Sequence, residues 1–312
     1  MIIPQCIRPG DRIAILSPAS VVNPDYIDGA ARLLAAEGFE PVVMPHAKGP
    51  ASGSFAAGDA DRVADMTAAW RDPSVRAILC ARGGYGCNHL IDKLPVDMLL
   101  ADPKWLIGFS DISALHALCQ HAGIVSLHAP MAKHLTEKGA GHYCTETLLR
   151  ILTDGLPVEY MTPHDPRNTC GDAEGMLIGG NLAAINGLAA TPYDPLALPG
   201  RKILFIEDIG EQIYEVERML IRLRLSGLLK DVAGILVGSF TQYNPDRNHP
   251  DMETMIARLF GTPAPCPIAF GFKAGHTDDN LPLPLGAGAR LTVAPEGTIL
   301  TLCAEQEADL QS

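Results

Sequence analysis

Three side chains that follow apolar runs have the types needed for acyl-transfer chemistry. Ser110 ends the run KWLIGFS, Glu207 ends KILFIE, and His276 lies in a Gly-flanked polar loop after PIAFGF. A serine hydroxyl can attack a carbonyl when a histidine removes its proton and an acid orients the imidazole. These residue types allow a serine hydrolase, although each residue also has a structural explanation.

Ser110 lies where an apolar strand meets a segment with helical character, residues 111–118. At a sharp strand-to-helix turn a serine hydroxyl is exposed, and the N–H groups at the helix start are free to stabilise an oxyanion. The hydrolase pattern GxSxG is incomplete here, because Ile112 stands in place of the second glycine. The structural alternative is that Ser110 only caps the helix.

A glycine turn, residues 82–86, follows the strand RAILC. Consecutive glycines allow a close approach to a ligand and suit an oxyanion hole or a phosphate cradle, although an ordinary Gly-rich turn is the alternative. The dinucleotide pattern GxGxxG fails, because His89 stands where the third glycine would be, and the pattern GxxxxGK[ST] is absent. The guanidinium of Arg82 could pair with a substrate carboxylate.

His276 is the most suggestive of the ten histidines, because its exposed loop offers little to a core. His128 and His134 follow a strand end and are closer alternatives than the rest. Glu207 ends an apolar run, where an unpaired carboxylate is costly and a histidine partner would resolve the cost. The alternative is that Glu207 or Asp208 opens the following helix, and Asp208 fits that role better.

The composition favours a protein that handles small molecules. The net charge of −12 disfavours nucleic acid as a partner. No apolar run approaches the roughly 18 residues that span a bilayer, and the N-terminal residues do not resemble a signal peptide, so we expect a cytoplasmic protein. The eight cysteines form no CxxC pair, and we expect most of them to be small buried residues. No HExxH pattern occurs, and the pair Asp278-Asp279 is weak evidence for a cation, so we expect neither a metal nor a cofactor.

The elements that must position these residues divide the chain in two. Residues 1–155 alternate apolar strands with helical segments at 24–37 and 58–71, which predicts an α/β domain with a parallel sheet. Residues 156–172 are rich in proline and polar residues, which indicates a linker or substrate loop. Residues 173–312 combine apolar strands, an amphipathic helix at 212–225 and the hairpin ARLTVAPEGTILTL, which predicts a smaller α+β domain.

Eight segments, in one order along nearly the whole chain, resemble the LD-carboxypeptidase family of serine peptidases. They are PGDRIAILSPAS, ARGGYG, IGFSDISALH, HAPM, IGGNLAAINGL, IEDIGEQIYEVERML, ILVGSF and FGFKAGHTDDNLPLPLG. The resemblance implies a flavodoxin-like N-terminal domain, a smaller swivelling β/α C-terminal domain and often a homodimer. It also implies a catalytic triad of Ser110, Glu207 and His276.

In that triad His276 would act as the base and Glu207 would hold the imidazole tautomer. The backbone N–H groups of Gly84 and Asp111 are the candidate oxyanion hole. Our candidate contacts for the substrate are Arg82, Gly83 and Tyr85.

The family implies a small peptide substrate, of which two kinds are known. One is the cytoplasmic murein tetrapeptide, which loses its terminal D-alanine during peptidoglycan recycling; the other is a microcin-like peptide-nucleotide. A nucleotide would benefit from an aromatic stacking platform. The presumed substrate loop has Tyr160 but no tryptophan, and both Trp70 and Trp105 lie in the first half, which favours the murein peptide.

Two other classes of function stay open. One is a small-molecule binding protein without turnover, in which Ser110 would be only a helix cap. The other is a nucleotide- or phosphate-dependent enzyme that uses ARGGYG and IGGN as anion cradles.

Overall fold

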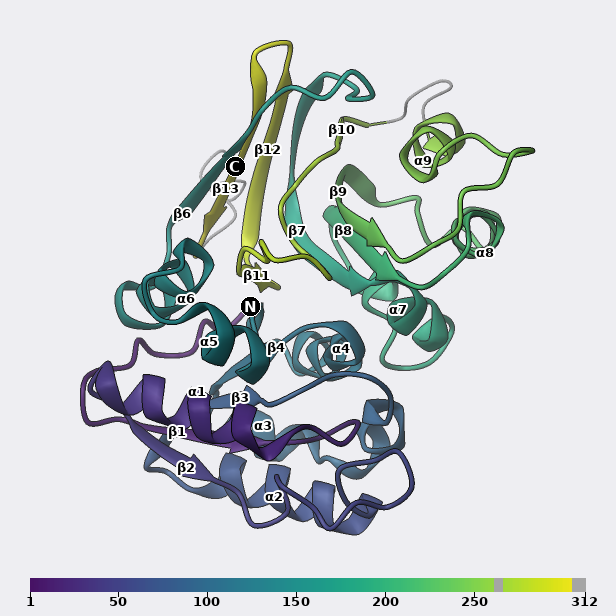
Figure 1. Ribbon diagram of the computed structural model, residues 1–312. Coiled ribbons are helices and arrows are strands. Elements are labelled where there is room, and N and C mark those ends of the chain that lie inside the picture. The colour runs from purple at the N-terminus through teal and green to yellow at the C-terminus, as the bar shows by residue number, and fades with distance from the viewer. Residues whose placement is uncertain (261–265, 305–312) are drawn as a thin grey trace. The chain divides into compact units, whose positions relative to one another are not determined.

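The computed structural model describes residues 1–260 and 266–304, and the chain divides into two compact units (Figure 1). The first unit comprises Met1–Gly155 with Asn280–Pro284, and the second comprises Leu156–Asp279 and the chain from Leu285. The short return of residues 280–284 to the first unit was not expected from the sequence.

The first unit contains a six-stranded sheet in the order β2-β1-β3-β4-β5-β11. The first five of these strands run parallel, in the flavodoxin-like order, so the predicted parallel sheet is confirmed. Its strands are β1 (Arg12–Leu16), β2 (Glu40–Val43), β3 (Val75–Cys80), β4 (Trp105–Gly108), β5 (Ser126–His128) and β11 (Leu283–Leu285).

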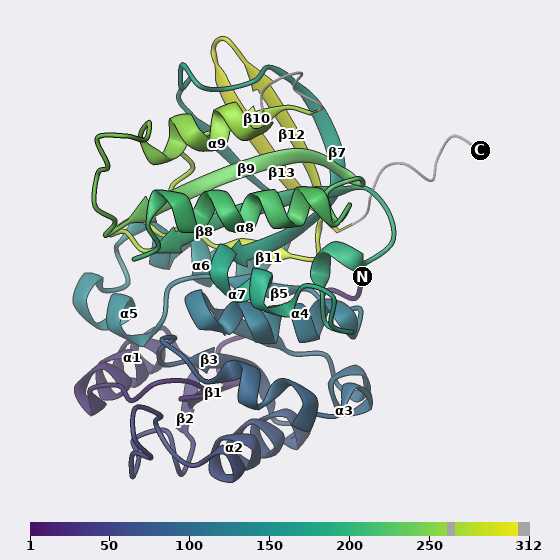
Figure 2. The ribbon, with the colours of Figure 1, turned by 90° about the vertical axis from the view of Figure 1, so that its right-hand side faces the viewer.

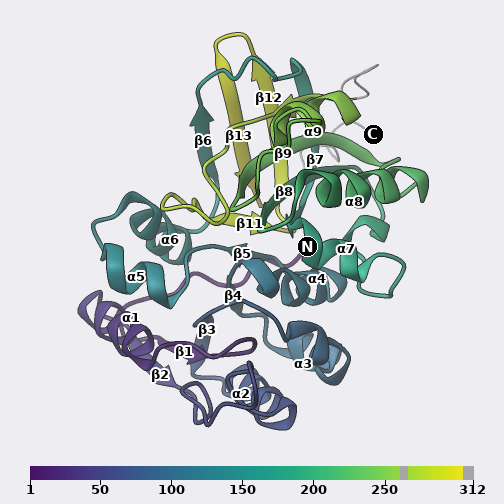
Figure 3. The same ribbon diagram turned by 45° about the vertical axis from the view of Figure 1, so that its right-hand side comes forward.

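Helices cover both faces of this sheet because its central strands are buried runs with no polar face. Figure 3 shows α1 on one side of β1 and β3 and α2 and α3 on the other. The helices of this unit are α1 (Pro24–Ala36), α2 (Asp59–Arg71), α3 (Val96–Ala101), α4 (Ser113–His121), α5 (Ala132–Lys138) and α6 (Tyr143–Asp154), with 3-10 turns at Cys87–His89, Ile91–Lys93 and Ser110–Ile112.

The second unit is built on a seven-stranded mixed sheet in the order β10-β9-β8-β7-β12-β13-β6. Strands β7 to β10 run parallel, while β12, β13 and β6 are antiparallel to their neighbours. The strands are β6 (Val158–Thr162), β7 (Gly171–Asn181), β8 (Lys202–Ile209), β9 (Val232–Thr241), β10 (Ile268–Ala269), β12 (Gly288–Ala294) and β13 (Gly297–Cys303).

Three helices pack on the parallel half of the second sheet: α7 (Leu182–Leu188), α8 (Ile213–Leu225) and α9 (Met252–Phe260). Figure 2 shows α8 and α9 lying across strands β8 and β9. Val216 and Leu220 of α8 and Ile256 of α9 are buried in one core with Ile206 of β8. A capping box between Gln212 and Glu215 begins α8, so the helix predicted at 212–225 is confirmed.

The segment 156–172, which we expected to be a linker or substrate loop, contains the edge strand β6. Val158 and Tyr160 point inward and are buried, whereas Glu159 and Met161 are exposed. This two-residue period turns one face of β6 toward the core. The backbone of β6 pairs with β13 at the edge of the sheet. The proline residues lie at its ends and do not interrupt the strand. The predicted C-terminal hairpin is the antiparallel pair β12 and β13.

All eight cysteines are free thiols, and five of them are buried. In the part of the chain that the structure describes, no helix has the length and apolar character needed to span a membrane.

Asp208, at the end of β8, stabilises a neighbouring helix and not the one that follows it. Its Oδ2 accepts a hydrogen bond from the Ala183 N–H at 2.8 Å, and its Oδ1 accepts one from Asn181 Nδ2 at 2.8 Å. Both donors belong to the start of α7, whereas α8 is capped by Gln212. The alternative that Glu207 or Asp208 opens the following helix is therefore wrong, because four residues separate even Asp208 from the first turn of α8.

Burial raises the pKa of Asp208 to about 6. Because this pKa lies above the value of about 4 in an unfolded chain, the protonated carboxyl stabilises the fold in acid, and that contribution is lost as the pH rises from about 4 through 6. In an Asp208→Asn variant the side chain does not titrate. We expect its unfolding free energy, relative to the wild type, to rise by up to about 3 kcal/mol between pH 4 and 7.5. Urea unfolding of both proteins between pH 4 and 7.5 measures this difference in unfolding free energy. A difference that does not change with pH would contradict the prediction.

Candidate active site

Three loops of the first unit meet at the carboxyl edge of its sheet, where β1, β3 and β4 end. The Ser20 N–H donates to the Gly83 carbonyl at 3.2 Å, and the Tyr85 N–H donates to Ser20 Oγ at 3.1 Å. Gly83 lies against Ser110, because a Cβ atom at position 83 would stand 2.9 Å from Ser110 Cβ. The loops after β1 and β3 leave at the switch point of the strand order, where open α/β sheets bind their ligands.

Ser110 has a backbone conformation that non-glycine residues rarely adopt. Its φ is 67°, in the left-handed region, and it follows the extended residue Phe109. The N-cap of the 3-10 turn is Phe109 and that of α4 is Ile112. Ser110 is therefore not a helix cap, so that alternative is wrong. A strained turn between a strand and a helix is the geometry that exposes the serine of a nucleophile elbow.

Glycine is required at both central positions of the turn beside Ser110. Gly84 has φ of 105°, and a Cβ there would stand 2.7 Å from Ser20 Cβ. Arg82 is exposed, and its Nη1 donates to the Val21 carbonyl at 2.6 Å. Tyr85 is 53% exposed, and its ring lies edge-on to His89 with 5.6 Å between the ring centroids.

The other two candidate residues meet in the second unit. His276 Nδ1 lies 2.8 Å from Glu207 Oε2, and Glu207 on β8 has no exposed surface. Because a carboxylate only accepts hydrogen bonds, this contact places the Nδ1 proton toward Glu207 and leaves Nε2 of the neutral ring as a base. The histidine thus partners a carboxylate that would be costly to bury alone.

Two glycines that sequence reasoning missed make room for this pair. Gly275 has φ of 117°, and a Cβ there would stand 2.7 Å from Glu207 Oε2. At Gly238 on β9 a Cβ would stand 2.6 Å from the Ala274 carbonyl oxygen and 3.3 Å from Glu207 Cβ. The segment 274–276 can therefore lie directly on β8 and β9. Both lie in segments quoted for the family resemblance, but the space that each glycine leaves for Glu207 depends on tertiary contacts.

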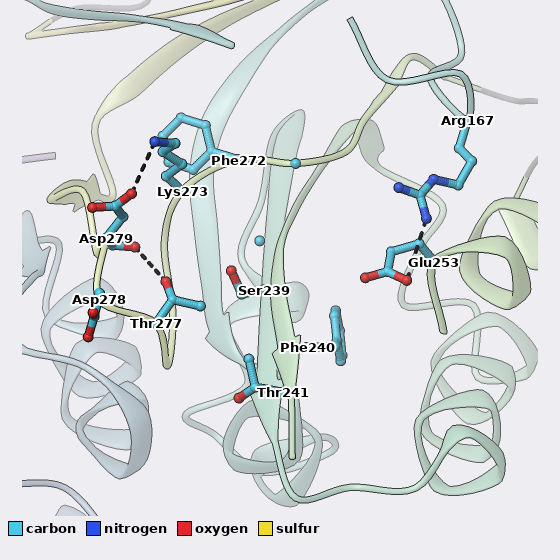
Figure 4. Close-up of a pocket in the computed structure, with 12 residues that line it drawn as sticks. Arg167, Ser239, Phe240, Thr241, Glu253, Phe272, Lys273, Thr277, Asp278 and Asp279 are labelled. Carbon is cyan, nitrogen blue, oxygen red and sulfur yellow. Dashed lines mark hydrogen bonds and ion pairs between the residues drawn. The ribbon is translucent and has the colours of Figure 1, made fainter. Parts of the chain in front are cut away.

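A pocket of about 460 Å³ in the second unit borders the loop that carries His276 (Figure 4). Lys273 and Asp279 pair on one side at 3.0 Å, and Arg167 and Glu253 pair on the opposite side at 3.5 Å. Three acids and two bases line it, so its formal charge is negative. The twelve lining residues are Arg167, Gly238, Ser239, Phe240, Thr241, Glu253, Gly271, Phe272, Lys273, Thr277, Asp278 and Asp279.

Tyr160, the aromatic residue of the presumed substrate loop, is only 7% exposed. Its ring packs edge-on against Phe272, with 5.5 Å between the centroids. It belongs to the core under β6 and offers no platform on which a nucleobase could stack.

Two other histidines, His128 and His116, are buried in the core of the first unit. His128 is fully buried with its ring 5.7 Å from that of Phe109. His116 lies under β4, where Nε2 contacts the Gly108 carbonyl at 2.9 Å and burial lowers its pKa to about 4. Within residues 1–260 and 266–304, no group of three His, Cys, Asp or Glu side chains is arranged to hold a metal ion.

Known proteins resemble this chain in sequence and in fold. The E. coli microcin C7 self-immunity protein is 30% identical over 247 residues, with 69% of this chain and 70% of that protein covered. The crystal structure of muramoyltetrapeptide carboxypeptidase from Oxalobacter formigenes matches with a TM-score of 0.85 and 29% identity, over 94% of this chain and 98% of that one.

Two whole-length relatives and two family models agree on the family. A Streptomyces coelicolor protein is 37% identical over 311 residues, 95% of this chain and 94% of its own length. The murein tetrapeptide carboxypeptidase of Pseudomonas aeruginosa is 32% identical over 296 residues, 90% of this chain and 92% of its own length. Residues 13–129 match the N-terminal domain of LD-carboxypeptidases, and residues 174–291 match the C-terminal domain. The chain therefore belongs to the LD-carboxypeptidase family and is a hydrolase of the carboxypeptidase type.

Proposed function

We propose that this enzyme removes the terminal D-alanine from murein tetrapeptide by cleaving an L,D-peptide bond, with Ser110 as nucleophile, His276 as base and Glu207 as the orienting acid. The observation that carries the proposal is the 2.8 Å contact between His276 Nδ1 and the fully buried Glu207 carboxylate. The strained backbone of Ser110 supports it from the other unit. The proposal requires that the units bring His276 Nε2 within hydrogen-bond reach of Ser110 Oγ.

In the first half-reaction His276 Nε2 takes the Ser110 proton while Oγ bonds to the carbonyl carbon. The oxyanion accepts hydrogen bonds from the N–H groups of Gly84 and Asp111, and Glu207 stabilises the imidazolium. When the tetrahedral intermediate collapses, the imidazolium gives its proton to the leaving amine of D-alanine. His276 then deprotonates a water molecule, which hydrolyses the acyl-enzyme and restores the Ser110 hydroxyl.

One structural observation favours the murein peptide over a peptide-nucleotide. Tyr160 is buried and cannot stack on a base. The murein substrate is the one in the name of the Pseudomonas aeruginosa relative.

Three further features belong to the same proposal. Arg82, Gly83 and Tyr85 of the glycine turn contact the substrate, and the guanidinium of Arg82, whose Nη1 donates to the Val21 carbonyl, also binds a substrate carboxylate. The enzyme acts in the cytoplasm during peptidoglycan recycling. It works as a homodimer, and light scattering would measure the mass of that dimer.

The substrate and the nucleophile are tested together with a tetrapeptide that ends in D-alanine. Mass spectrometry should show loss of one alanine by the wild type, and Ser110→Ala should lower kcat by about 10⁶-fold because the nucleophile is gone. Ser226→Ala, at the C-cap of α8, is the matched serine control and should cleave normally. Equal cleavage by wild type and Ser110→Ala would show that another residue is the nucleophile. An inactive wild type would redirect the search to peptide-nucleotides.

The role of Glu207 is tested by comparison with its neighbour. Glu207→Gln keeps the shape of the side chain but cannot stabilise the imidazolium, so we expect kcat to fall by about 10⁴-fold at pH 7. Asp208→Asn alters the adjacent carboxylate, which contacts α7, and should leave kcat within about threefold of the wild type. Steady-state kinetics with the tetrapeptide measure both. Equal effects of the two substitutions would remove the special role of Glu207.

A further inference from the structure

One arginine on α2 is buried directly behind the glycine turn. Arg62 is only 1% exposed, and a buried guanidinium charge needs an acidic partner. Its Nη2 donates to Asp59 Oδ1 at 2.5 Å, and its guanidinium carbon lies 4.7 Å from the centre of the Phe55 ring. Hydrogen bonds from Lys93 and Arg62 lower the pKa of Asp59 to about 2, so this partner is ionised at neutral pH.

The other end of the guanidinium joins two loops of the site. Arg62 Nη1 donates to the Pro18 carbonyl at 2.5 Å and to the Gly86 carbonyl at 3.1 Å. Pro18 follows β1, and Gly86 closes the glycine turn that follows β3. A Cβ at position 86 would stand 2.6 Å from Nη1, so a glycine there permits the approach. A single side chain therefore ties together the two loops that leave at the switch point of the sheet.

The same end of the turn is also held from the Ser110 side. Asp111 is 8% exposed, and its Oδ2 accepts a hydrogen bond from the Cys87 N–H at 2.9 Å. Gly86 and Cys87 are consecutive. The side chain of Arg62 fixes the Gly86 carbonyl, and the side chain of Asp111, from a different element, fixes the Cys87 N–H. Between these anchors and Ser20 the Gly83-Gly84 peptide has little freedom to rotate.

We propose that Arg62 and the Asp111 side chain are positioning residues that hold the Gly83-Gly84 backbone in register with Ser110, so that the Gly84 N–H meets the oxyanion. This inference rests on the proposed function. Neither side chain needs to touch the substrate. A planar guanidinium is suited to this task because its separate N–H groups can reach Asp59 and both carbonyls at once, whereas a lysine ammonium is a single point.

The effect should fall on kcat and not on substrate binding, because an oxyanion exists only after attack. Loss of one oxyanion donor costs about 10²- to 10³-fold in kcat, and a displaced donor should cost less. We therefore expect Arg62→Lys and Asp111→Ala each to lower kcat by about 10- to 100-fold, with KM within about threefold. Asp111→Asn keeps an oxygen that can accept from the Cys87 N–H, and it should recover most of the lost kcat.

The test is steady-state hydrolysis of the D-alanine tetrapeptide, with kcat expressed per reactive serine. A fluorophosphonate that labels Ser110 to completion, counted by intact mass, gives the number of reactive sites and corrects for any variant that folds incompletely. Lys93→Met is the matched control, because it removes the other cation on Asp59, at 3.0 Å, without touching either loop. Its kcat and KM should equal those of the wild type.

The outcomes separate the two proposals. A wild type that neither cleaves nor labels would overturn the proposed function and this inference with it. Suppose that the wild type is active, and that Arg62→Lys and Asp111→Ala have the same kcat per labelled serine or differ from it only in KM. That result would overturn the inference and leave the proposed function standing. The same conclusion would follow if Asp111→Asn were as impaired as Asp111→Ala.

Discussion

The buried carboxylate of Glu207 is the constraint around which the second unit is arranged. A carboxylate without solvent contact inside a sheet requires a hydrogen-bond donor, and His276 Nδ1 supplies one at 2.8 Å. For that contact the loop after β10 must lie directly on β8, which in turn requires glycine at 238 and 275. The low dielectric that makes the acid costly also strengthens its bond to the imidazole. In the proposed mechanism, stability and chemistry thus depend on the same hydrogen bond.

The first unit places strain where its chemistry is proposed. Ser110 occupies a left-handed backbone conformation, which costs about 1 to 3 kcal/mol and persists only when the surroundings enforce it. Those surroundings are the buried strand β4, the His116 ring bound to the Gly108 carbonyl, and Gly83 packed against the serine. The packing of a rigid sheet offsets the local cost.

Adjacent residues on one strand can have separate tasks because strand side chains alternate between faces. Glu207 faces His276, whereas Asp208 faces the start of α7 and binds its N–H groups. The two acids are neighbours in the chain, yet one belongs to the proposed site and the other to the scaffold. Because Asp208 contacts α7, its raised pKa makes the stability of the fold depend on pH.

The sequence by itself determined most of the elements, β6 excepted, and the residues suited to chemistry, because both depend on neighbours a few positions apart. Apolar runs between helical segments predicted the parallel sheet, and the residues around Ser110 predicted a strand-to-helix turn. Only the tertiary structure decided the partners of polar groups. Tyr160 lies in the core, since β6 joins the edge of a sheet, and Arg62 meets Gly86 from 24 positions away. Such contacts depend on how the chain folds back on itself, which no short pattern encodes.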